Sequence, residues 1–137
     1  MNCKSYDSFE SLKEDSIRNA IIEDNEQITV NVHLIVSYNR ANKIYTAHAL
    51  EFDIVGESKT KKGVVKDTLE LIINHISFCK VYNNKDKIIS PAPDEYWREF
   101  FEKTEEEYII KPKIPKLTNS QMPFRPSQFN NVCVVSG

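Results

Sequence analysis

The stretch YTAHALEFDIVGESKTKKGVVKDTLELIINHI, residues 45–76, decides the fold. From its second half onward, apolar residues recur at spacings of 4, 3, 4 and 3: Val65, Leu69, Ile72, Ile76 and Cys79. This spacing gathers the side chains on one face and predicts a helix over about 60–80. Ser58 or Thr60 precedes this helix as its N-cap.

Three further apolar residues widen this stripe: Val64, Leu71 and Phe78. One side of such a helix can lie on a sheet, and the second apolar side then needs a cover of its own. The sequence therefore predicts that a second element or a second subunit packs against the helix.

The residues before this helix alternate as strands do. Apolar side chains occupy every second position from residue 28: Ile28, Val30, Val32, Leu34 and Val36. The alternation predicts a half-buried strand over 28–38, and a second strand follows over about 43–50. The turn residues 39–42 join the two as an antiparallel hairpin, and a third strand is predicted over 53–57.

Helices are predicted on both sides of this unit. Residues 8–22 have an imperfect apolar face, with Ser8 or Ser11 as the N-cap. Further along, Pro93 followed by acidic residues is typical of a helix start. Residues 94–107, DEYWREFFEKTEEE, are therefore predicted to form an aromatic helix.

The prolines are confined to the C-terminal third, because all six lie from Pro91 onward. Proline is excluded from helix interiors and central strands, so the compact core is expected before Pro91. Segment 111–128 is predicted to be an extended arm or a disordered tail. The apolar residues 132–135 are predicted to form a short edge strand.

The predicted fold class is α+β: a three-stranded antiparallel sheet packed by one main helix, with an N-terminal helix, a C-terminal aromatic helix and a proline-rich tail. We divide the chain into a helical extension over 1–27, an α+β domain over 28–104 and an extended tail over 105–137. The 137 residues suffice for one domain of average size.

Charge, hydrophobicity and cysteine content exclude several classes of protein. Lys and Arg number 18 against 20 Asp and Glu, and this net charge of -2 excludes a generically basic nucleic-acid binder. No apolar run is long enough to span a membrane, and residues 1–19 lack the apolar core expected of a secretory signal, so we expect none there. Cys3, Cys79 and Cys133 are odd in number and widely spaced, which predicts neither a disulfide framework nor a zinc site and fits a reduced cytoplasm.

No catalytic set emerges from the residue types. His33, His48 and His75 form no HxxH or HExxH motif. On the hairpin, His33 and His48 are either a two-histidine metal or acid–base site or two histidines of the sheet surface. Carboxylates surround the third strand and the main helix: Glu51, Asp53, Asp67 and Glu70. Their pattern fixes no complete magnesium site, so we expect no enzyme, no catalytic residue, no metal and no cofactor.

The most basic stretch is GESKTKKGVVK, residues 56–66. Its lysines precede and begin the main helix: Lys59, Lys61, Lys62 and Lys66. A helix N-terminus also attracts phosphate through its backbone amides. The strand and helix order together with these lysines resembles the double-stranded RNA-binding domain, which makes RNA binding the alternative function.

Two blocks of the sequence resemble the HicB-like antitoxin family. The first is Ala-Leu-Glu-Phe-Asp-Ile-Val-Gly, residues 49–56, followed by Thr60; the second is ISPAPDEYW, residues 89–97. The resemblance covers about 28–101. It implies a sheet with one main helix, close to the topology of the double-stranded RNA-binding domain. It also implies a binding partner, because HicB antitoxins mask a small basic HicA ribonuclease and often dimerise.

The resemblance sets the expected function: a protein-binding module of the antitoxin type that sequesters a small basic toxin, or an orphan scaffold of this family. Acidic residues near the junction of sheet and helix are the predicted partner-binding set: Glu51, Asp53, Glu57 and Glu70. A homodimer is expected. Residues 105–137 lack a second helix pair, so the DNA-binding segment of many family members is not expected here.

Overall fold

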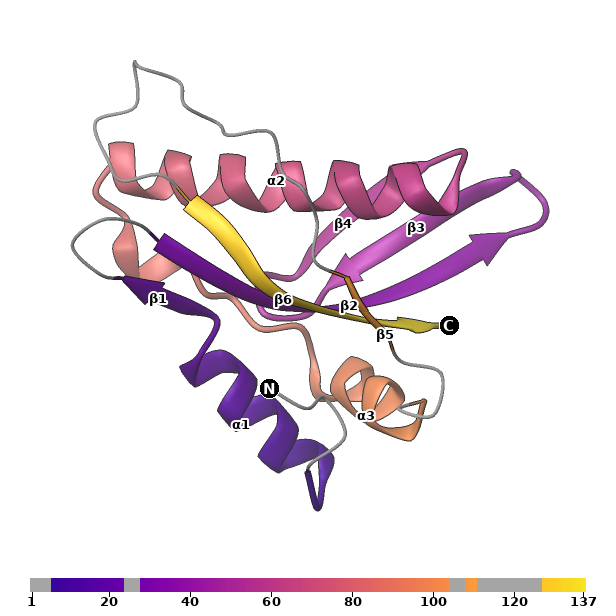
Figure 1. The fold of residues 1–137 in the computed structure, drawn as a ribbon, viewed down its shortest axis with the longest axis horizontal. Coiled ribbons are helices and arrows are strands. Elements are labelled where there is room, and N and C mark those ends of the chain that lie inside the picture. The colour runs from indigo at the N-terminus through magenta and orange to yellow at the C-terminus, as the bar shows by residue number, and fades with distance from the viewer. Residues whose placement is uncertain (1–5, 24–27, 104–107, 111–126) are drawn as a thin grey trace.

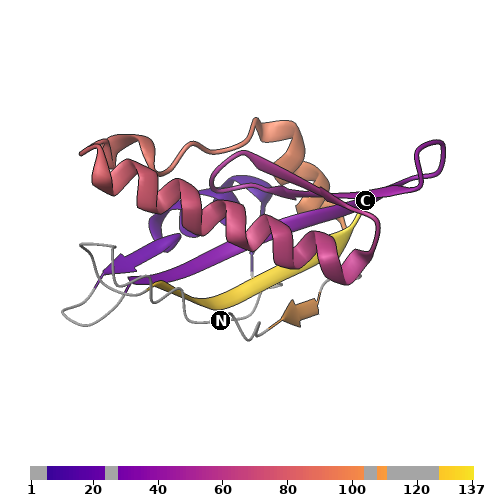
Figure 2. The ribbon, with the colours of Figure 1, turned by 90° about the horizontal axis from the view of Figure 1, so that it is seen from above.

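A curled sheet forms the centre of the fold, and helices cover both of its faces (Figure 1). The computed structural model of the chain describes residues 6–23, 28–103, 108–110 and 127–137. The predicted α+β class is confirmed. The helix α2 lies across one face, while α1 and α3 lie on the other (Figures 1 and 2).

The elements follow the chain with these bounds. The helices are α1 (Phe9–Arg18), α2 (Lys61–Val81) and α3 (Asp94–Glu102), with a short 3₁₀ turn, η1 (Lys85–Lys87). The strands are β1 (Ile21–Glu23), β2 (Ile28–Asn39), β3 (Ile44–Ala49), β4 (Ile54–Ser58), β5 (Tyr108–Ile110) and β6 (Ser127–Ser136). In the sheet the order is β4-β3-β2-β6-β5, and β1 pairs with β2.

The predicted antiparallel run of three strands is present as β2, β3 and β4, but it forms only part of the sheet. On the other side of β2, strand β6 pairs in parallel, and β5 pairs antiparallel to β6. The predicted sheet of three strands therefore had too few strands. Local alternation reveals a strand but not how many partners it has, and β2 is buried on both faces from Val30 to Val36.

Strand β6 corrects two expectations about the C-terminal part. Residues 132–135 do not form a short edge strand, because they belong to the ten residues of β6, which lies between β2 and β5. The core does not end before Pro91 either, since Phe129, Val132 and Val134 are buried against α2. The last proline is Pro126, so residues from 127 onward are free to pair. Of the predicted arm 111–128, residues up to 126 lie outside the described residues.

Two apolar cores fill the space between the sheet and its helices. The first lies under α2, which begins after the N-cap Thr60; the backbone N–H of Gly63 donates to the Thr60 hydroxyl over 2.9 Å. The second core lies between the opposite face and the helices α1 and α3: Leu12, Ile35, Leu50, Ala92, Trp97, Phe100, Cys133 and Val135. The face opposite α2 thus becomes a core instead of a solvated surface.

Both flanking helices are shorter than predicted. Helix α1 ends at Arg18 instead of residue 22, because Asn19 caps it and the chain then forms β1. Asn31 of β2 fixes this turn, since its side chain donates to the Asn19 carbonyl over 2.7 Å and its backbone N–H donates to Ala20. Helix α3 ends at Glu102, and residues 104–107, which include the acidic run 105–107, lie outside the described residues.

The cysteines also differ from expectation. The sequence predicts no disulfide framework, yet Cys133 is disulfide-bonded, while Cys79 is a buried free thiol in the α2 core. The spacing of the cysteines therefore gives no argument for a reduced compartment. None of the helices in the described ranges is long and apolar enough to cross a membrane.

Close packing of α2 on β4 depends on Gly56. A Cβ at this position would lie 2.1 Å from Oγ1 of Thr68, which is itself held because its hydroxyl donates to the Val64 carbonyl over 2.7 Å. We expect Gly56→Ala to lower the free energy of unfolding by about 1–3 kcal/mol, measured by urea denaturation. Adding Thr68→Ala should restore part of the loss. Unchanged stability of Gly56→Ala would show that the helix shifts without cost.

Candidate functional site

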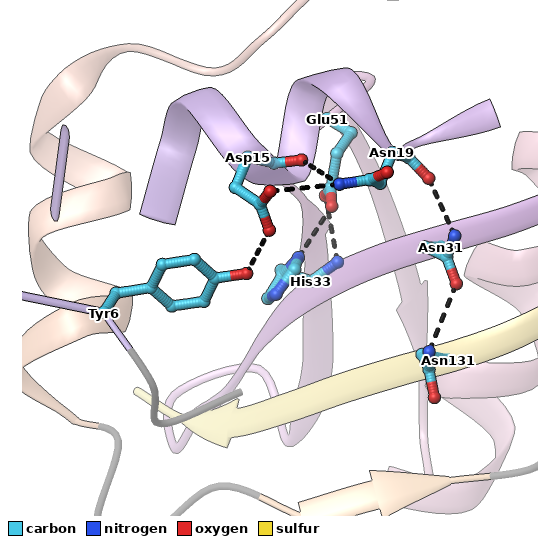
Figure 3. A network of polar contacts seen from close by, with 7 residues as sticks. All are labelled: Tyr6, Asp15, Asn19, Asn31, His33, Glu51 and Asn131. Carbon is cyan, nitrogen blue, oxygen red and sulfur yellow. Dashed lines mark hydrogen bonds and ion pairs between the residues drawn. The ribbon is translucent and has the colours of Figure 1, made fainter. Parts of the chain in front are cut away.

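A buried, hydrogen-bonded pair of side chains, Glu51 and His33, lies at the centre of the second core. Glu51 follows the end of β3, and His33 lies in the middle of β2. Nδ1 of His33 lies 2.7 Å from Oε2 of Glu51, and the backbone N–H of His33 donates to Oε1 over 2.9 Å (Figure 3). Both side chains are fully buried. One carboxylate therefore binds the ring and the backbone of the same residue.

The chain around Glu51 is held by a second set of hydrogen bonds. The backbone N–H of Ser90 donates to the Glu51 carbonyl over 3.2 Å, and that of Ala92 donates to the Leu50 carbonyl over 2.8 Å. The indole N–H of Trp97 then donates to the Ala92 carbonyl over 3.1 Å. The segment before α3 is thereby fastened to the corner that carries Glu51.

Polar contacts extend from α1 to β6 (Figure 3). The Tyr6 hydroxyl donates to Asp15, and the Asn19 side chain donates to the same residue. The Asn19 carbonyl accepts from Asn31, whose side-chain oxygen accepts from Asn131 over 3.4 Å. These contacts join α1, β2 and β6 along one side of the sheet.

Tyr6 ends this network near the buried pair. Burial raises the pKa of the Tyr6 hydroxyl well above its ordinary value, and the hydrogen bond to Asp15 and the negative charges of Asp15 and Glu51 raise it further. The hydroxyl therefore stays protonated and acts as a donor at neutral pH.

The buried pair has the geometry of an acid–base dyad but no access to a substrate. Nε2 of His33 makes no hydrogen bond within the described part of the chain. The His33 ring packs edge-on against Phe100 at 5.0 Å and lies 6.1 Å from Trp97, measured between ring centroids. A general base must reach the proton that it removes, and this ring is enclosed by aromatic side chains. We assign the pair a structural role.

The two histidines of the hairpin do not share a site. His48 lies opposite Ile35 in the β2–β3 register, and its Nε2 lies 2.6 Å from Oδ1 of Asp53. His33 was predicted as part of a site or as a surface histidine, and it is neither, because α3 covers it. Within the described ranges, no group of three or more His, Cys, Asp and Glu residues could hold a metal ion.

The predicted acidic partner-binding set is not assembled on one surface. Glu51 is buried against His33 and offers no charge to a partner. Asp53 and Glu57 are exposed on the β4 side of the sheet, and Glu70 is exposed on α2. Glu57 points away from α2, because side chains alternate along β4 and its neighbour Gly56 faces that helix.

The predicted basic set does lie together. The lysines are all exposed and surround the first turns of α2: Lys59, Lys61, Lys62 and Lys66. This cluster is separated along α2 from Phe78, Val81 and Tyr82, the exposed apolar residues at the other end of the helix.

The last turns of α2 expose a group of large apolar side chains, which we call the α2 patch: Phe78, Val81 and Tyr82. Phe78 is 58% exposed and Tyr82 64% exposed, and their rings lie 4.6 Å apart between centroids. Of the residues that widened the predicted stripe, Val64 is buried while Leu71 and Phe78 are exposed. In the described part of the chain, no element covers this second side of α2.

The α2 patch continues a flank that faces β4. Residues at spacings of 3, 4, 3 and 4 form this flank: Thr68, Leu71, His75, Phe78 and Tyr82. Thr68 lies against Gly56 of β4, and the His75 ring packs edge-on against Phe52, which precedes β4. The opposite flank faces β1, where Lys80 pairs with Glu23. The exposed residues Leu71, Phe78 and Tyr82 therefore lie on the side of α2 next to the end of the sheet, and Val81 lies beside them on the solvent side.

No protein-family model matches the chain, and neither a curated protein nor a solved structure matches it. The geometry of the exposed surfaces therefore carries the functional argument.

The buried pair gives a direct test of its structural role. We expect Glu51→Ala to lower the free energy of unfolding by about 3–5 kcal/mol, because the buried His33 ring and its backbone N–H lose their acceptor. Chemical denaturation followed by circular dichroism measures the change. The matched control is Glu57→Ala on exposed β4, expected to stay within about 0.5 kcal/mol of the parent. Equal effects of the two substitutions would contradict the assignment.

Proposed function

We propose that the protein is a protein-binding module that captures its partner through the α2 patch. The observation that carries the proposal is the exposure of Phe78, Val81 and Tyr82 on a helix whose other side is fully packed. Aromatic side chains of this kind are enriched at protein interfaces and supply much of the binding energy when they are covered.

The energetics favour a protein partner for this surface. Each large apolar side chain gains about 1.5–3 kcal/mol when it is fully buried. The rings of Phe78 and Tyr82 pack against each other, tilted by 40°, on the last turn of α2 and its C-cap, so little conformational freedom is lost when a partner covers them. Single exposed apolar residues are common on proteins, but here three neighbours share two turns of one helix.

The resemblance to HicB-like antitoxins points to the class of partner: a small basic toxin of the ribonuclease type. The observed order β2-β3-β4-α2 agrees with the order that this resemblance implies. The exposed carboxylates Asp53, Glu57 and Glu70 add long-range attraction for a basic partner, although Glu51 contributes none. Within the same resemblance, the alternative is that the chain is an orphan scaffold of this family that has no toxin partner.

RNA binding is the second candidate, favoured by the four exposed lysines around the start of α2. Backbone amides at this helix start add partial positive charge. The Thr60 cap takes one of them, since its hydroxyl accepts from Gly63. The whole chain carries a net charge of -2, so long-range attraction to RNA is weak outside this cluster.

Partner capture tests the proposed function. A tagged chain used as bait in cells that produce it should retain a basic protein in stoichiometric amount. The double variant Phe78→Ser/Tyr82→Ser should lose at least about nine tenths of this protein, because each ring supplies hot-spot energy. The matched control is Tyr38→Ser, which removes an exposed ring on β2 and should retain the partner. Equal retention by both variants would exclude the α2 patch.

A duplex-RNA titration separates the second candidate. If the α2 patch carries the function, the parent chain shows no salt-dependent RNA binding at low ionic strength. If the lysines carry it, affinity falls with salt, with a slope of about -0.9 per phosphate contacted in a DNA-like duplex. Lys62→Glu/Lys66→Glu should then abolish binding, while Lys85→Glu/Lys87→Glu on η1 leaves it unchanged.

A further inference from the structure

The hairpin of β2 and β3 extends past the first turn of α2 and carries a pair of aromatic rings near its tip (Figures 1 and 2). Tyr38 of β2 lies opposite Tyr45 of β3, and their ring centroids are 4.7 Å apart with the rings tilted by 48°. Tyr45 packs against the core under α2, whereas Tyr38 is 46% exposed. The inner ring therefore supports the outer ring, which stays accessible to a ligand.

Both rings lie on the face of the sheet that α2 covers. Tyr38 follows Val36 by two residues and Tyr45 precedes Ala47 by two, and Val36 and Ala47 belong to the core under α2. Side chains two residues apart on a strand share a face. Ser58, the last residue of β4, lies opposite Tyr45 and so shares this face too. The ring pair thus lies next to the point where the chain enters α2.

Basic side chains approach this ring pair from two segments of the chain. They are exposed, and they come from the hairpin turn and from the start of α2: Arg40, Lys43, Lys59, Lys61, Lys62 and Lys66. Neither residues 37–46 nor residues 58–66 contain an aspartate or a glutamate. Because the whole chain carries a net charge of -2, positive charge is concentrated at this end of the molecule. A polyanion is therefore attracted to the end that carries the rings.

Two of the lysines lie on the flank of α2 that faces β2, the strand of Tyr38. Lys62 precedes Lys80 by 18 residues, which is about five helical turns, so the two side chains leave the helix in the same direction. Lys80 pairs with Glu23 of β1, and β1 pairs with β2. Lys66 follows one turn after Lys62. This flank therefore brings positive charge to the side of α2 on which the exposed ring lies.

An exposed ring among cations fits a single strand of nucleic acid better than a duplex. Unpaired bases stack on aromatic side chains, while basic side chains follow the phosphates. In a duplex the bases are paired and stacked on each other, so Tyr38 would have no base to contact. Beside the rings, Ser58 is partly exposed, and its hydroxyl can bind the 2′-hydroxyl that distinguishes RNA from DNA.

We propose that this end of the molecule binds single-stranded RNA. A base stacks on Tyr38, which Tyr45 supports, and the neighbouring phosphates contact the hairpin turn and the lysines at the start of α2. The proposal deepens the second candidate function, RNA binding, because it names the class of RNA and the ring that contacts its bases. It does not rest on the α2 patch, which lies at the other end of the helix.

Fluorescence anisotropy of a labelled oligouridine of about ten nucleotides tests the proposal. The parent chain should bind it at low ionic strength, with a salt slope of about -0.7 per phosphate contacted. Tyr38→Ser should weaken binding about tenfold, because the base loses its stacking surface, while Tyr38→Phe should stay within about twofold of the parent. A parent that does not bind, or a Tyr38→Ser variant that binds like the parent, would overturn the proposal.

Variants elsewhere on α2 supply the matched controls, with circular dichroism showing that each is folded. Lys62→Gln/Lys66→Gln should reduce the magnitude of the salt slope by about 1.4, because two phosphate contacts are lost. Tyr82→Ser removes a ring that is 64% exposed at the other end of α2 and should bind the oligouridine like the parent. Equal losses for Tyr38→Ser and Tyr82→Ser would contradict a site at the hairpin.

Competition identifies the class of nucleic acid. An unlabelled RNA duplex of the same length should compete at least about tenfold less well than oligouridine, because its bases are paired. Oligodeoxyuridine should also compete less well, because it lacks the 2′-hydroxyl. Equal competition by either one would overturn the assignment to single-stranded RNA. A parent that binds no RNA but captures its partner through the α2 patch would reject this site and leave the proposed function standing.

Discussion

The fold depends on the contact between Glu51 and His33. A buried carboxylate is costly unless donors surround it, and His33 supplies two, its ring and its backbone N–H. The contact fixes the end of β3 against the middle of β2. It thereby sets the corner at which the chain turns towards β4, and the segment before α3 is fastened to the same corner through Ser90 and Ala92.

This corner explains why both faces of the sheet are buried. On the α2 side, β2 contributes the apolar residues that the alternation in its sequence predicts to be buried, such as Val32 and Leu34. On the other side, His33 and Ile35 are covered by α3, whose Trp97 and Phe100 enclose the pair of His33 and Glu51. A histidine–carboxylate pair with the geometry of a catalytic dyad thus serves to join the aromatic helix to the sheet.

The exposed surfaces of the molecule are separate from the buried pair of His33 and Glu51. With the His33 pair enclosed, the exposed features of the described residues include the α2 patch, the lysines around the start of α2 and the unpaired edge of β4. The flank of α2 through Thr68 and His75 lies between the α2 patch and β4: Thr68 packs against Gly56 of β4, and His75 packs against Phe52, which precedes this strand.

The sequence by itself determined the elements whose signals are local. The apolar period of α2, the Thr60 cap and the alternation of β2 predicted these elements to within a few residues. The sequence also marked Phe78 as belonging to a second apolar side. Only the tertiary structure decided that this side is exposed, that Glu51 is buried and that β6 pairs with β2. Such outcomes depend on contacts between residues far apart in the chain. Local periodicity carries no information about which distant segment packs against a given strand or helix.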